Sequence, residues 1–411
     1  MVDVIVVGTR VAGASTALLL ARRGLSVLAL DRARFPSDTV STHQVQVPGG
    51  ARLHRWGLLE RLRAAGTPPA RTVRFDAGPV VLQGRLPEVD GVDAVHSPRR
   101  TLLDAMLVDA AREAGAQVRE RFRVEELVVD DDRVVGVRGR DPHGRRVTET
   151  APIVVGADGR RSLVSRAVGS RLRHDVPPLT VASYTYWSGV PLTGGEVYSR
   201  PARAIGAWPT DDGLVMTYVA APAAELGAFR ADPGRALLRV LDDCGDLGER
   251  VRAGRREHPV VVTPDVPNRV HVPYGPGWAL VGDAGLVMDP ITGMGIADAL
   301  RDAELLADAI TVGLGGSVGL DVALRRYAHR HDAAAMPIWR HTTELARLTF
   351  RPEQDVLFRA IAERPGATEQ FLAVLTGAAL PDTIFGPRGL VRLLGVRGMV
   401  DLARTRRRRT A

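Results

Sequence analysis

The sequence predicts an α/β fold with a Rossmann-like nucleotide-binding domain, a second domain with a mixed or antiparallel β-sheet, and a C-terminal helical region. Three observations support this prediction. The chain opens with a strand, a glycine turn and a helix, the start of a βαβ unit. Residues 180–220 alternate apolar and polar side chains between turn signals, which predicts antiparallel strands with one covered face. From about residue 335 the pattern is helical, with proline and glycine breaks.

The elements follow in order along the chain. Val2–Val7 is a continuous apolar run that suits a buried parallel strand. A helix is expected over Ala14–Arg23, ended by Gly24, and Leu25–Asp31 reads as the second strand. The later elements are helices at Gly50–Arg63 and Thr101–Ala114, strands from Val124 to Val155 with a turn at Asp141–Gly144, and a strand near residue 278.

These elements divide the chain into three regions. The nucleotide-binding domain is expected to combine residues 1–75, 97–175 and 270–335. The β-sheet domain combines residues 76–96 and 176–269, and residues 336–411 form the C-terminal helical region with a basic tail. A chain of 411 residues is long enough for such a multidomain arrangement.

Composition indicates a soluble globular protein, with 45% hydrophobic and 25% charged residues. The first residues lack the features of a signal peptide, and the apolar run Ala17–Ala21 is too short for a membrane span. One cysteine, Cys244, excludes an internal disulfide and fits a reducing compartment. We therefore expect a cytoplasmic protein without a membrane span.

The net charge of +8 comes from arginine alone, because the sequence contains no lysine. Asparagine occurs once, at Asn268, so the bias looks compositional and is weak evidence for nucleic-acid binding. The dense basic run Arg404–Arg409 is interpreted as a solvated tail. The lack of lysine also excludes a Schiff base and a P-loop, and no metal site is expected.

The stretch VVGTRVAGAS, residues 6–15, nearly matches the glycine fingerprint of a dinucleotide site. Gly8 and Gly13 stand at its first and third glycine positions, but Arg10 replaces the middle glycine. Asp31 follows at the spacing that reaches a ribose hydroxyl. Alone, the two glycines could equally mark a tight strand-to-helix turn.

Two later segments strengthen this interpretation. In VVGADGRRSLVSR, residues 154–166, a buried strand runs into a turn with Asp158, which could also simply cap the next helix. In residues 278–307, a strand ends at Gly282-Asp283, and Gly293-Met294-Gly295 then opens a long helix. An ordinary strand, loop and helix would account for this segment alone, but not for all three motifs in this order.

Together, GTRVAG with Asp31, GADGRRS and GDAGLVMDPITGMG resemble the FAD-dependent oxidoreductases of the p-hydroxybenzoate-hydroxylase fold. This superfamily is also called the group A flavoprotein monooxygenases and has geranylgeranyl-reductase-like relatives. The motifs span residues 1 to about 310 and are specific for the fold rather than for a substrate. The resemblance implies non-covalently bound FAD.

The resemblance also implies roles for individual residues toward the adenosine half of FAD. Gly8 and Gly13 would turn the chain so that a helix N-terminus meets the pyrophosphate. Asp31 would bind the ribose, Arg32 would lie beside the adenine, and Val124 would place backbone groups against the adenine.

The flavin half of FAD is assigned by resemblance to three segments. Pro290 would lie against the isoalloxazine ring, and Asp283 would bind ribityl hydroxyls. The following helix would aim its positive end at the flavin N1–C2=O edge and favour the reduced anion by about 1 kcal/mol or more. Beyond these roles, the resemblance implies cofactor contacts, not assigned to one half of FAD, for Arg100, Asp158 and Gly159, and it places Gly282, Gly293, Met294 and Gly295 in the flavin segment.

Two departures from the family pattern qualify these roles. Arg10 could bring its guanidinium to a phosphate, or face solvent without a role. Leu286, Val287 and Met288 are apolar where many relatives have a polar residue soon after the aspartate. No polar catalytic contribution is therefore expected from that loop.

The substrate is expected between the flavin and one face of the second sheet. Tyr184 and Tyr186 share a strand face, with Trp187 on the other. His43 is the candidate catalytic residue, although a lone histidine is more often a structural hydrogen-bonding group. Tyr184, Tyr186, Trp208, Met216 and Tyr218 form the predicted substrate wall, although at least half of them could simply be core. This wall suits a hydrophobic, aromatic or polyketide-like small molecule.

Three reaction types follow from the resemblance. The favoured one is monooxygenation through a flavin C4a-hydroperoxide with NAD(P)H as the electron donor, supplied directly or through a separate flavin reductase. The alternatives are reduction or dehydrogenation of a bulky substrate without oxygen insertion, and a flavoprotein that transfers electrons or acts as a sensor. Halogenation is not expected, because halogenating relatives use a lysine and a W-x-W-x-I-P motif that this sequence lacks.

Overall fold

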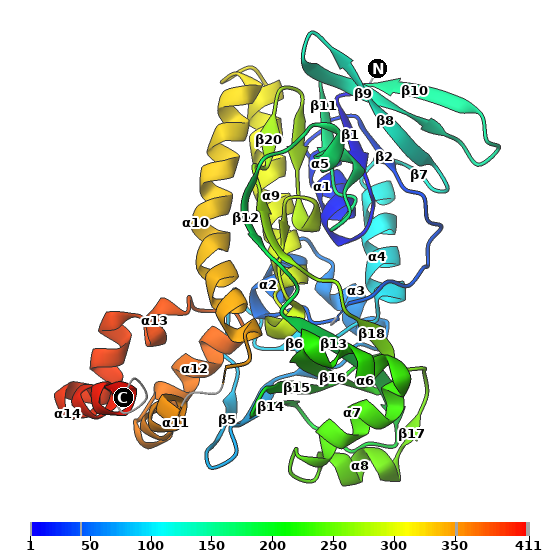
Figure 1. Cartoon of the computed structure of the whole chain (residues 1–411). Helices are drawn as coiled ribbons and strands as arrows, with labels where there is room; N and C mark the ends of the chain where they lie inside the picture. The colour runs from blue at the N-terminus through cyan, green and yellow to red at the C-terminus, as the bar shows by residue number, and fades with distance from the viewer. Residues whose placement is uncertain (1, 42, 350–351, 408–411) are drawn as a thin grey trace.

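The computed structural model describes residues 2–41, 43–349 and 352–407 (Figure 1). Its central layer is a six-stranded sheet of order β20-β21-β11-β1-β2-β7, parallel except for β20. The strands are β1 (Val4–Val7), β2 (Val27–Leu30), β7 (Gln117–Arg119), β11 (Ile153–Gly156), β20 (Tyr274–Gly275) and β21 (Trp278–Leu280). The predicted Rossmann-like domain is therefore confirmed.

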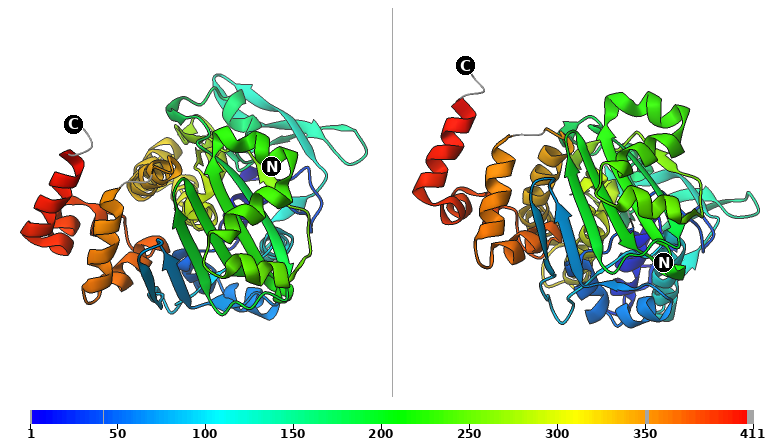
Figure 2. Two further views of the ribbon diagram at one scale, coloured as in Figure 1. Left: turned by 60° about the horizontal axis from the view of Figure 1, so that its bottom comes forward. Right: turned by 90° about the horizontal axis from the view of Figure 1, so that it is seen from below.

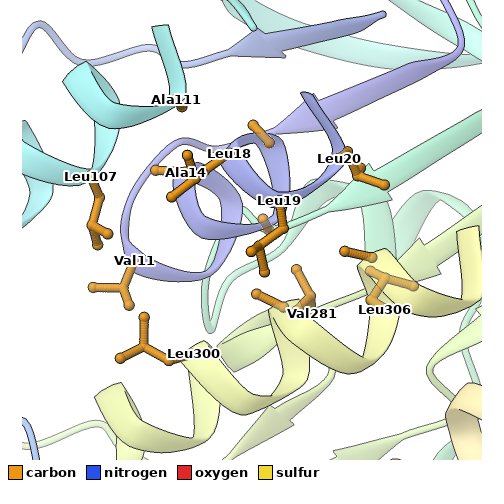
Figure 3. Packing of buried hydrophobic residues seen from close by; sticks show 14 of the residues in the cluster. Val11, Ala14, Leu18, Leu19, Leu20, Leu107, Ala111, Val281, Leu300 and Leu306 are labelled. Atoms are coloured by element: carbon orange, nitrogen blue, oxygen red, sulfur yellow. The ribbon is translucent and has the colours of Figure 1, made fainter. Parts of the chain in front are cut away.

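Three helices cover one face of this sheet, namely α1 (Val11–Ala21), α4 (Arg100–Glu113) and α9 (Gly295–Leu314). Helix α1 lies between the other two, and Leu18, Leu107 and Leu300 pack where they meet (Figure 3). Their side chains are removed from water, which is the main favourable term that holds this layer together.

The other face of the parallel sheet is covered by a smaller antiparallel sheet. Its strands are β8 (Arg123–Asp130), β9 (Arg133–Arg140) and β10 (Arg146–Thr150). Phe122, Val134 and Val137 pack against Ile5 and Leu28 of the central strands. The short helix α5 (Leu163–Ala167) follows β11, and the strands β12 (Leu172–Val176), β19 (Asn268–His271) and β22 (Leu286–Val287) form a third sheet beside it.

The second domain is built on a mixed sheet of order β17-β13-β16-β15-β14-β4-β5, with β18 paired to β13. Strands β14 and β4 pair in parallel, and the other neighbours are antiparallel. The strands are β4 (Thr72–Asp76), β5 (Val81–Arg85), β13 (Thr180–Ser188), β14 (Gly195–Arg200), β15 (Arg203–Pro209), β16 (Val215–Pro222), β17 (Arg255–Arg256) and β18 (Val261–Thr263). The mixed sheet predicted from the sequence is confirmed.

The prediction that only one face of this sheet is covered is wrong. Helices α6 (Leu226–Ala231), α7 (Pro233–Asp242) and α8 (Leu247–Ala253) pack on the face that carries Trp187. Helices α11 (Pro352–Glu363) and α12 (Ala367–Leu375) pack on the face that carries Tyr184. Figure 2 shows the sheet between these two groups of helices, the first green and the second orange. Both faces are apolar because both are buried.

The C-terminal region is helical, as predicted. It begins within α10 (Leu320–Ala346) and continues through α11, α12, α13 (Asp382–Phe385) and α14 (Pro387–Arg407). The boundary expected between residues 335 and 336 falls inside α10, which runs without interruption from one region into the next. Residues 408–411, which include the end of the basic run Arg404–Arg409, lie outside the described residues.

One predicted helix is divided. Residues expected as a single helix over Gly50–Arg63 form α2 (Val47–Arg55) and α3 (Leu59–Ala64). Gly57 lies between them with φ +73°, a left-handed conformation that glycine adopts readily and that ends a helix. In the part of the chain described, no helix is long and apolar enough to cross a bilayer.

Candidate active site

The close packing where β1 enters α1 requires Gly8 in the turn and Gly13 in the first turn of α1. Gly8 has φ +93°, and a Cβ there would lie 2.5 Å from the Ala157 carbonyl oxygen on the neighbouring strand. A Cβ at Gly13 would lie 1.8 Å from the Gly8 carbonyl oxygen. Any larger residue would force β1, β11 and α1 apart, so the close approach seen here depends on glycine at both positions.

Asp31 directly follows β2 and is held against this turn. Its Oδ2 accepts hydrogen bonds from the Thr9 amide at 2.6 Å and the Thr9 hydroxyl at 3.1 Å. Its Oδ1 accepts from the Ala33 amide at 2.8 Å. The carboxylate is thus fixed beside the glycine turn, whereas Arg32 is exposed and Val124 is half-buried in β8. Their predicted contacts with adenosine stay predictions.

Arg10 is bound to protein groups rather than directed freely into solvent. One guanidinium nitrogen lies 2.6 Å from Asp104 Oδ2 and 3.3 Å from the Ser37 carbonyl oxygen. The other donates to the Ser37 hydroxyl and to the Asp38 carbonyl oxygen. Arg10 therefore does not face solvent freely, because its side chain joins the turn to α4 and to residues 37–38. Its predicted contact with a phosphate stays a prediction.

Arg100 also binds the Asp104 carboxylate. Its guanidinium donates two hydrogen bonds to Asp104, at 2.9 and 3.0 Å, from the first turn of α4. Asp104 is fully buried and so depends on both arginines for its hydrogen bonds. Arg100 is itself buried, which places a fixed positive charge beside the turn.

The second motif serves the local structure of α5. Asp158 accepts hydrogen bonds from the Ser162 hydroxyl at 2.5 Å and the Leu163 amide at 2.6 Å. Asp158 thus accepts hydrogen bonds from the first-turn amides of α5, and Ser162 is the N-cap residue of that helix. Burial raises the pKa of the Asp158 carboxyl despite these donors. Gly159 follows with φ +78°, and the predicted cofactor contact of both residues stays a prediction.

The third motif, which begins at Gly282, packs against the N-terminal turn of α1. Gly282 has φ +60°, and a Cβ there would lie 2.8 Å from the Ala12 Cβ. Asp283 comes next, at the carboxyl end of β21, and its side chain is exposed although protein surrounds it closely enough to raise its pKa by desolvation. Among the described residues, none lies within hydrogen-bond distance of the Asp283 carboxylate, so it is available to a ligand.

The loop before α9 contains Pro290, followed by Gly293 and Gly295. Gly293 has φ +62°, and a Cβ there would lie 2.0 Å from Gln44 Oε1, so the loop packs directly on residues 44–46. Met294 is buried and Gly295, the first residue of α9, is exposed, with no atom within 4 Å of the point where a Cβ would lie. The end of a largely buried, 20-residue helix is therefore open beside Asp283 and Pro290.

These features fit FAD. The open amide end of α9 suits an anionic or electron-rich ring edge, and the exposed Asp283 carboxylate suits hydroxyl donors such as a ribityl chain. The turn at Gly8 and Gly13 presents the N-terminus of α1, where Arg100 adds positive charge. The donor set therefore matches a dinucleotide with a negatively charged pyrophosphate.

A cavity of about 530 Å³ lies next to this loop. Its floor is the sheet face that carries Trp208, Met216 and Tyr218, three of the five predicted wall residues. Pro290 and Met294 form one side of it. The opposite wall, which the sequence did not reveal, comes from the C-terminal helices and includes Ile338, His341, Leu357, Phe358, Phe371 and Leu375.

Tyr184 and Tyr186 lie on the same sheet face but pack around His43 instead of lining the cavity. The His43 Nε2 and the Tyr186 hydroxyl are 2.7 Å apart, and both tyrosine rings meet the imidazole edge to face. His43 is buried with φ +63°, and burial and nearby Arg100 lower its pKa to about 4. The imidazole is therefore neutral near pH 7.

Sequence reasoning also missed Gln44 and Gln46, which stand beside His43 in the segment STHQVQV. Gln46 Nε2 donates to Gln44 Oε1 and to the Thr292 carbonyl oxygen, both at 3.2 Å. Both glutamines line the cavity. The alternation of polar and apolar residues in this segment was the available signal, since it places residues 44 and 46 on one side of an extended chain.

Comparison with known proteins agrees with this geometry. A family model described as an FAD binding domain matches residues 1–218. A digeranylgeranylglycerophospholipid reductase of Methanosarcina acetivorans is 23% identical over 355 residues, which cover 83% of this chain and 81% of the relative. The corresponding reductase 1 of Methanopyrus kandleri is 26% identical over 402 residues, which cover 93% of this chain and 99% of the relative.

Solved structures share the fold. A flavoprotein/dehydrogenase of Cytophaga hutchinsonii superposes with a TM-score of 0.82 at 17% identity, covering 98% of this chain and 100% of the other. The myxobacterial chondrochloren halogenase gives 0.77 at 22% identity, covering 92% and 98%. PqsL, a probable FAD-dependent monooxygenase from Pseudomonas aeruginosa, gives 0.72 at 22% identity, covering 84% and 95%.

The family match covers more than half of the chain, and it includes the glycine turn, Asp31 and the GADGRRS segment. The likeness of the solved structures extends the same fold over the sheet domain and the C-terminal helices. The chain therefore belongs to the FAD binding domain family of FAD-dependent oxidoreductases.

Proposed function

We propose that this protein is an FAD-dependent monooxygenase that hydroxylates or epoxidises a bulky, mostly apolar small molecule, with NAD(P)H as the electron donor. The observation that carries the proposal is the cavity of about 530 Å³ that shares the loop Pro290–Met294 with the open end of α9. A substrate in this cavity would lie against the loop that the resemblance places beside the isoalloxazine ring. Cavities of this volume hold drug-sized molecules.

The residues of this chain would hold, orient and shield the reactants. FAD, when bound, would supply electron transfer from NAD(P)H to dioxygen. The amide end of α9 would stabilise negative charge on the adjoining ring edge, and Asp283 would fix the ribityl chain. Apolar walls with Trp208, Met216 and Met294 would exclude water from the reacting centre. His43, held neutral, would position Tyr186 by its 2.7 Å hydrogen bond.

A second candidate function is reduction of a bulky apolar substrate without oxygen insertion. The observation that favours it is the similarity to digeranylgeranylglycerophospholipid reductases over most of the chain. An apolar cavity of this volume would suit a folded polyprenyl chain as well as a ring system. The two candidates share the FAD site and differ only in the acceptor of the electrons.

Labelled dioxygen separates these candidates. Purified protein, loaded with FAD, is supplied with NADH or NADPH and a panel of polycyclic phenols and polyprenyl alcohols under ¹⁸O₂. A monooxygenase consumes the reduced nucleotide faster with a substrate and transfers one labelled oxygen atom to the product. Sustained anaerobic turnover without label in air would replace this proposal by the reductase, and flavin reduction that responds to no compound would favour electron transfer or sensing.

The same assay with added bromide or chloride tests halogenation. The absence of lysine and of the W-x-W-x-I-P motif supports the expectation that no halogenated product forms. The likeness to halogenases in the solved structures is below 25% identity and concerns the fold.

A further inference from the structure

We propose that His341 determines the substrate specificity of the cavity by hydrogen bonding to a hydroxyl group on an otherwise apolar molecule. This inference rests on the proposed function, since it names a specificity-determining residue of the same site and the substrate class that this residue selects. Its basis is an imidazole in the apolar wall of the cavity whose nitrogens are accessible and have no hydrogen-bond partner in the described part of the chain.

Helix α10 directs His341 toward the cavity. Ile338, His341 and Leu345 follow one another at intervals of three and four residues, so they share one face of the helix, and all three line the cavity. The next residue, Thr342, meets the loop before α9, because its hydroxyl lies 3.0 Å from the Thr292 hydroxyl. His341 therefore stands in an otherwise apolar stripe of α10, at a part of the helix that adjoins this loop.

An aromatic neighbour holds the imidazole ring. His341 stacks on Phe385 of α13, with ring centroids 5.5 Å apart and an angle of 18° between the ring planes. Phe385 lines the cavity as well. Stacking covers a face of the imidazole but not its edge, which carries both nitrogens. The ring is thus positioned by an apolar contact that uses none of its hydrogen-bonding capacity.

Both ring nitrogens of His341 are available to a ligand. No hydrogen bond or ion pair joins either nitrogen to another residue that the structure describes. His341 is half-buried, and its nitrogens keep accessible surface, in contrast to the Gln46 side-chain oxygen and the Tyr218 hydroxyl, which are enclosed by protein. A molecule in the cavity can therefore reach the His341 imidazole without a rearrangement of the wall.

The chemistry of a neutral imidazole favours a hydroxyl group as its partner. Burial lowers the pKa of His341, and the negative charge of Asp382 opposes this effect without overcoming it, so the ring is neutral near pH 7. A neutral imidazole has one nitrogen that donates and one that accepts, and here no protein partner determines which is which. A hydroxyl can pair with either nitrogen, whereas a carbonyl oxygen pairs only with the protonated one. A carboxylate would need an imidazolium to balance its charge in the apolar wall.

The same imidazole disfavours molecules that lack a hydroxyl. An entirely apolar ligand would displace water from the His341 nitrogens and leave them without a partner, which costs binding free energy. Other polar groups of the wall do not discriminate in this way, because protein groups already satisfy them. The Thr376 hydroxyl donates to the Leu372 carbonyl oxygen at 2.8 Å, and the Tyr198 hydroxyl donates to Glu196 at 2.6 Å.

A matched pair of probes measures the preference. 4-Phenylphenol and 4-methylbiphenyl have the same ring system and differ by a hydroxyl in place of a methyl group. Their dissociation constants are measured with the FAD-loaded protein by equilibrium dialysis, which requires no turnover. The constant for the methyl compound divided by that for the phenol defines the hydroxyl preference. Comparing this preference between protein variants removes the difference in hydrophobicity between the two probes.

Variants then locate the preference. His341→Phe should lower it about three- to tenfold, because this change keeps a ring against Phe385 but removes both nitrogens. The loss should come from weaker binding of the phenol, with little change for the methyl compound. His174→Phe is the matched control: His174 also packs against an aromatic side chain of α10, Trp339, but it does not line the cavity, and the preference should be unchanged. Flavin absorbance and melting temperature establish that each variant is folded.

Three outcomes would overturn the inference. An unchanged preference in His341→Phe would show that this residue does not select a hydroxyl. An equal loss of affinity for both probes would show that His341 only shapes the cavity, and failure of the wild type to bind either probe would show that this wall does not take up a hydroxylated apolar molecule. Each result leaves the ¹⁸O₂ experiment free to give a labelled product with another substrate. An unlabelled product there would overturn the proposed monooxygenase without altering the dialysis result.

Discussion

Arg10 and Asp104, 94 positions apart in the sequence, form an ion pair of 2.6 Å across the turn that begins α1. Asp104 is fully buried and Arg10 is 29% exposed in its side chain. The arginine that replaces the middle glycine of the fingerprint thus supports a buried carboxylate, together with Arg100. Arg10 therefore links the turn to α4 from its solvent-exposed side.

Arg10→Ala should therefore act mainly on stability. We expect the free energy of unfolding to fall by about 1–2 kcal/mol, because Asp104 loses one donor but keeps the two hydrogen bonds from Arg100. Urea unfolding of the FAD-loaded protein measures this loss. Arg34→Ala, an exposed position in the following loop, is the control and should change stability by less than about 0.5 kcal/mol.

Asp283→Ala should weaken FAD binding more than Arg10→Ala does. The carboxylate is exposed and, among the described residues, has no partner, so its loss leaves the protein intact but removes a hydrogen bond to the cofactor worth roughly 1–3 kcal/mol. Dissociation constants from flavin fluorescence quenching compare the variants. A larger effect of Arg10→Ala would identify Arg10 as a phosphate ligand.

Gly295→Ala tests whether Gly295 is needed for protein packing or for contact with the cofactor. A methyl group at Gly295 meets no protein atom within 4 Å, so stability without FAD should change by less than about 1 kcal/mol. If the end of α9 faces the flavin, FAD affinity should still fall or the flavin absorption bands should shift. Gly227→Ala, also exposed and also without contacts, should change neither quantity; unaltered FAD binding in Gly295→Ala would place the flavin elsewhere.

His331 should make stability depend on pH above neutrality. It lies between Asp302 and Asp332, 3.4 and 3.2 Å from their oxygens, and despite burial these carboxylates raise its pKa to about 9. The folded value exceeds the unfolded value of about 6.5, so the stabilisation is complete below pH 6.5 and is lost as pH rises toward 9.

The loss should be on the order of 3 kcal/mol across that range, measured by urea unfolding at a series of pH values. His331→Gln should abolish this part of the pH dependence. His329→Gln, at an exposed position on the same helix, should retain it. A wild-type curve that stays flat from pH 6.5 to 9 would show that His331 is neutral in the folded protein.

The sequence was sufficient for the parts of the fold that depend on local pattern. The strand, turn and helix around Gly8 were predictable because glycine spacing and an apolar run determine them within a few residues. The alternation in β13 correctly placed Tyr184 and Tyr186 opposite Trp187. The helices α6–α8 were missed, although Asp232 and Pro233 form a helix N-cap and first position that the sequence displays.

Only the floor of the cavity could be predicted from the sequence. Its floor comes from adjacent strands, where a regular two-residue period shows which side chains share a face. Its opposite wall depends on contacts such as the one between Phe75 and Phe371, whose ring centroids are 4.8 Å apart although the residues are far separated in sequence. No local pattern specifies such a pair.

The two walls of the cavity are encoded in separate parts of the chain. The floor lies within the stretch matched by the FAD binding domain, which ends at Tyr218, and the opposite wall is built from residues beyond Pro337. Helix α10 leads from the cofactor domain to the C-terminal helices without a break. A junction placed inside this helix would therefore connect the N-terminal part of one protein to the C-terminal part of another without a new loop. A chimaera that takes its last 70 or so residues from a relative should keep its flavin and accept molecules of a different shape.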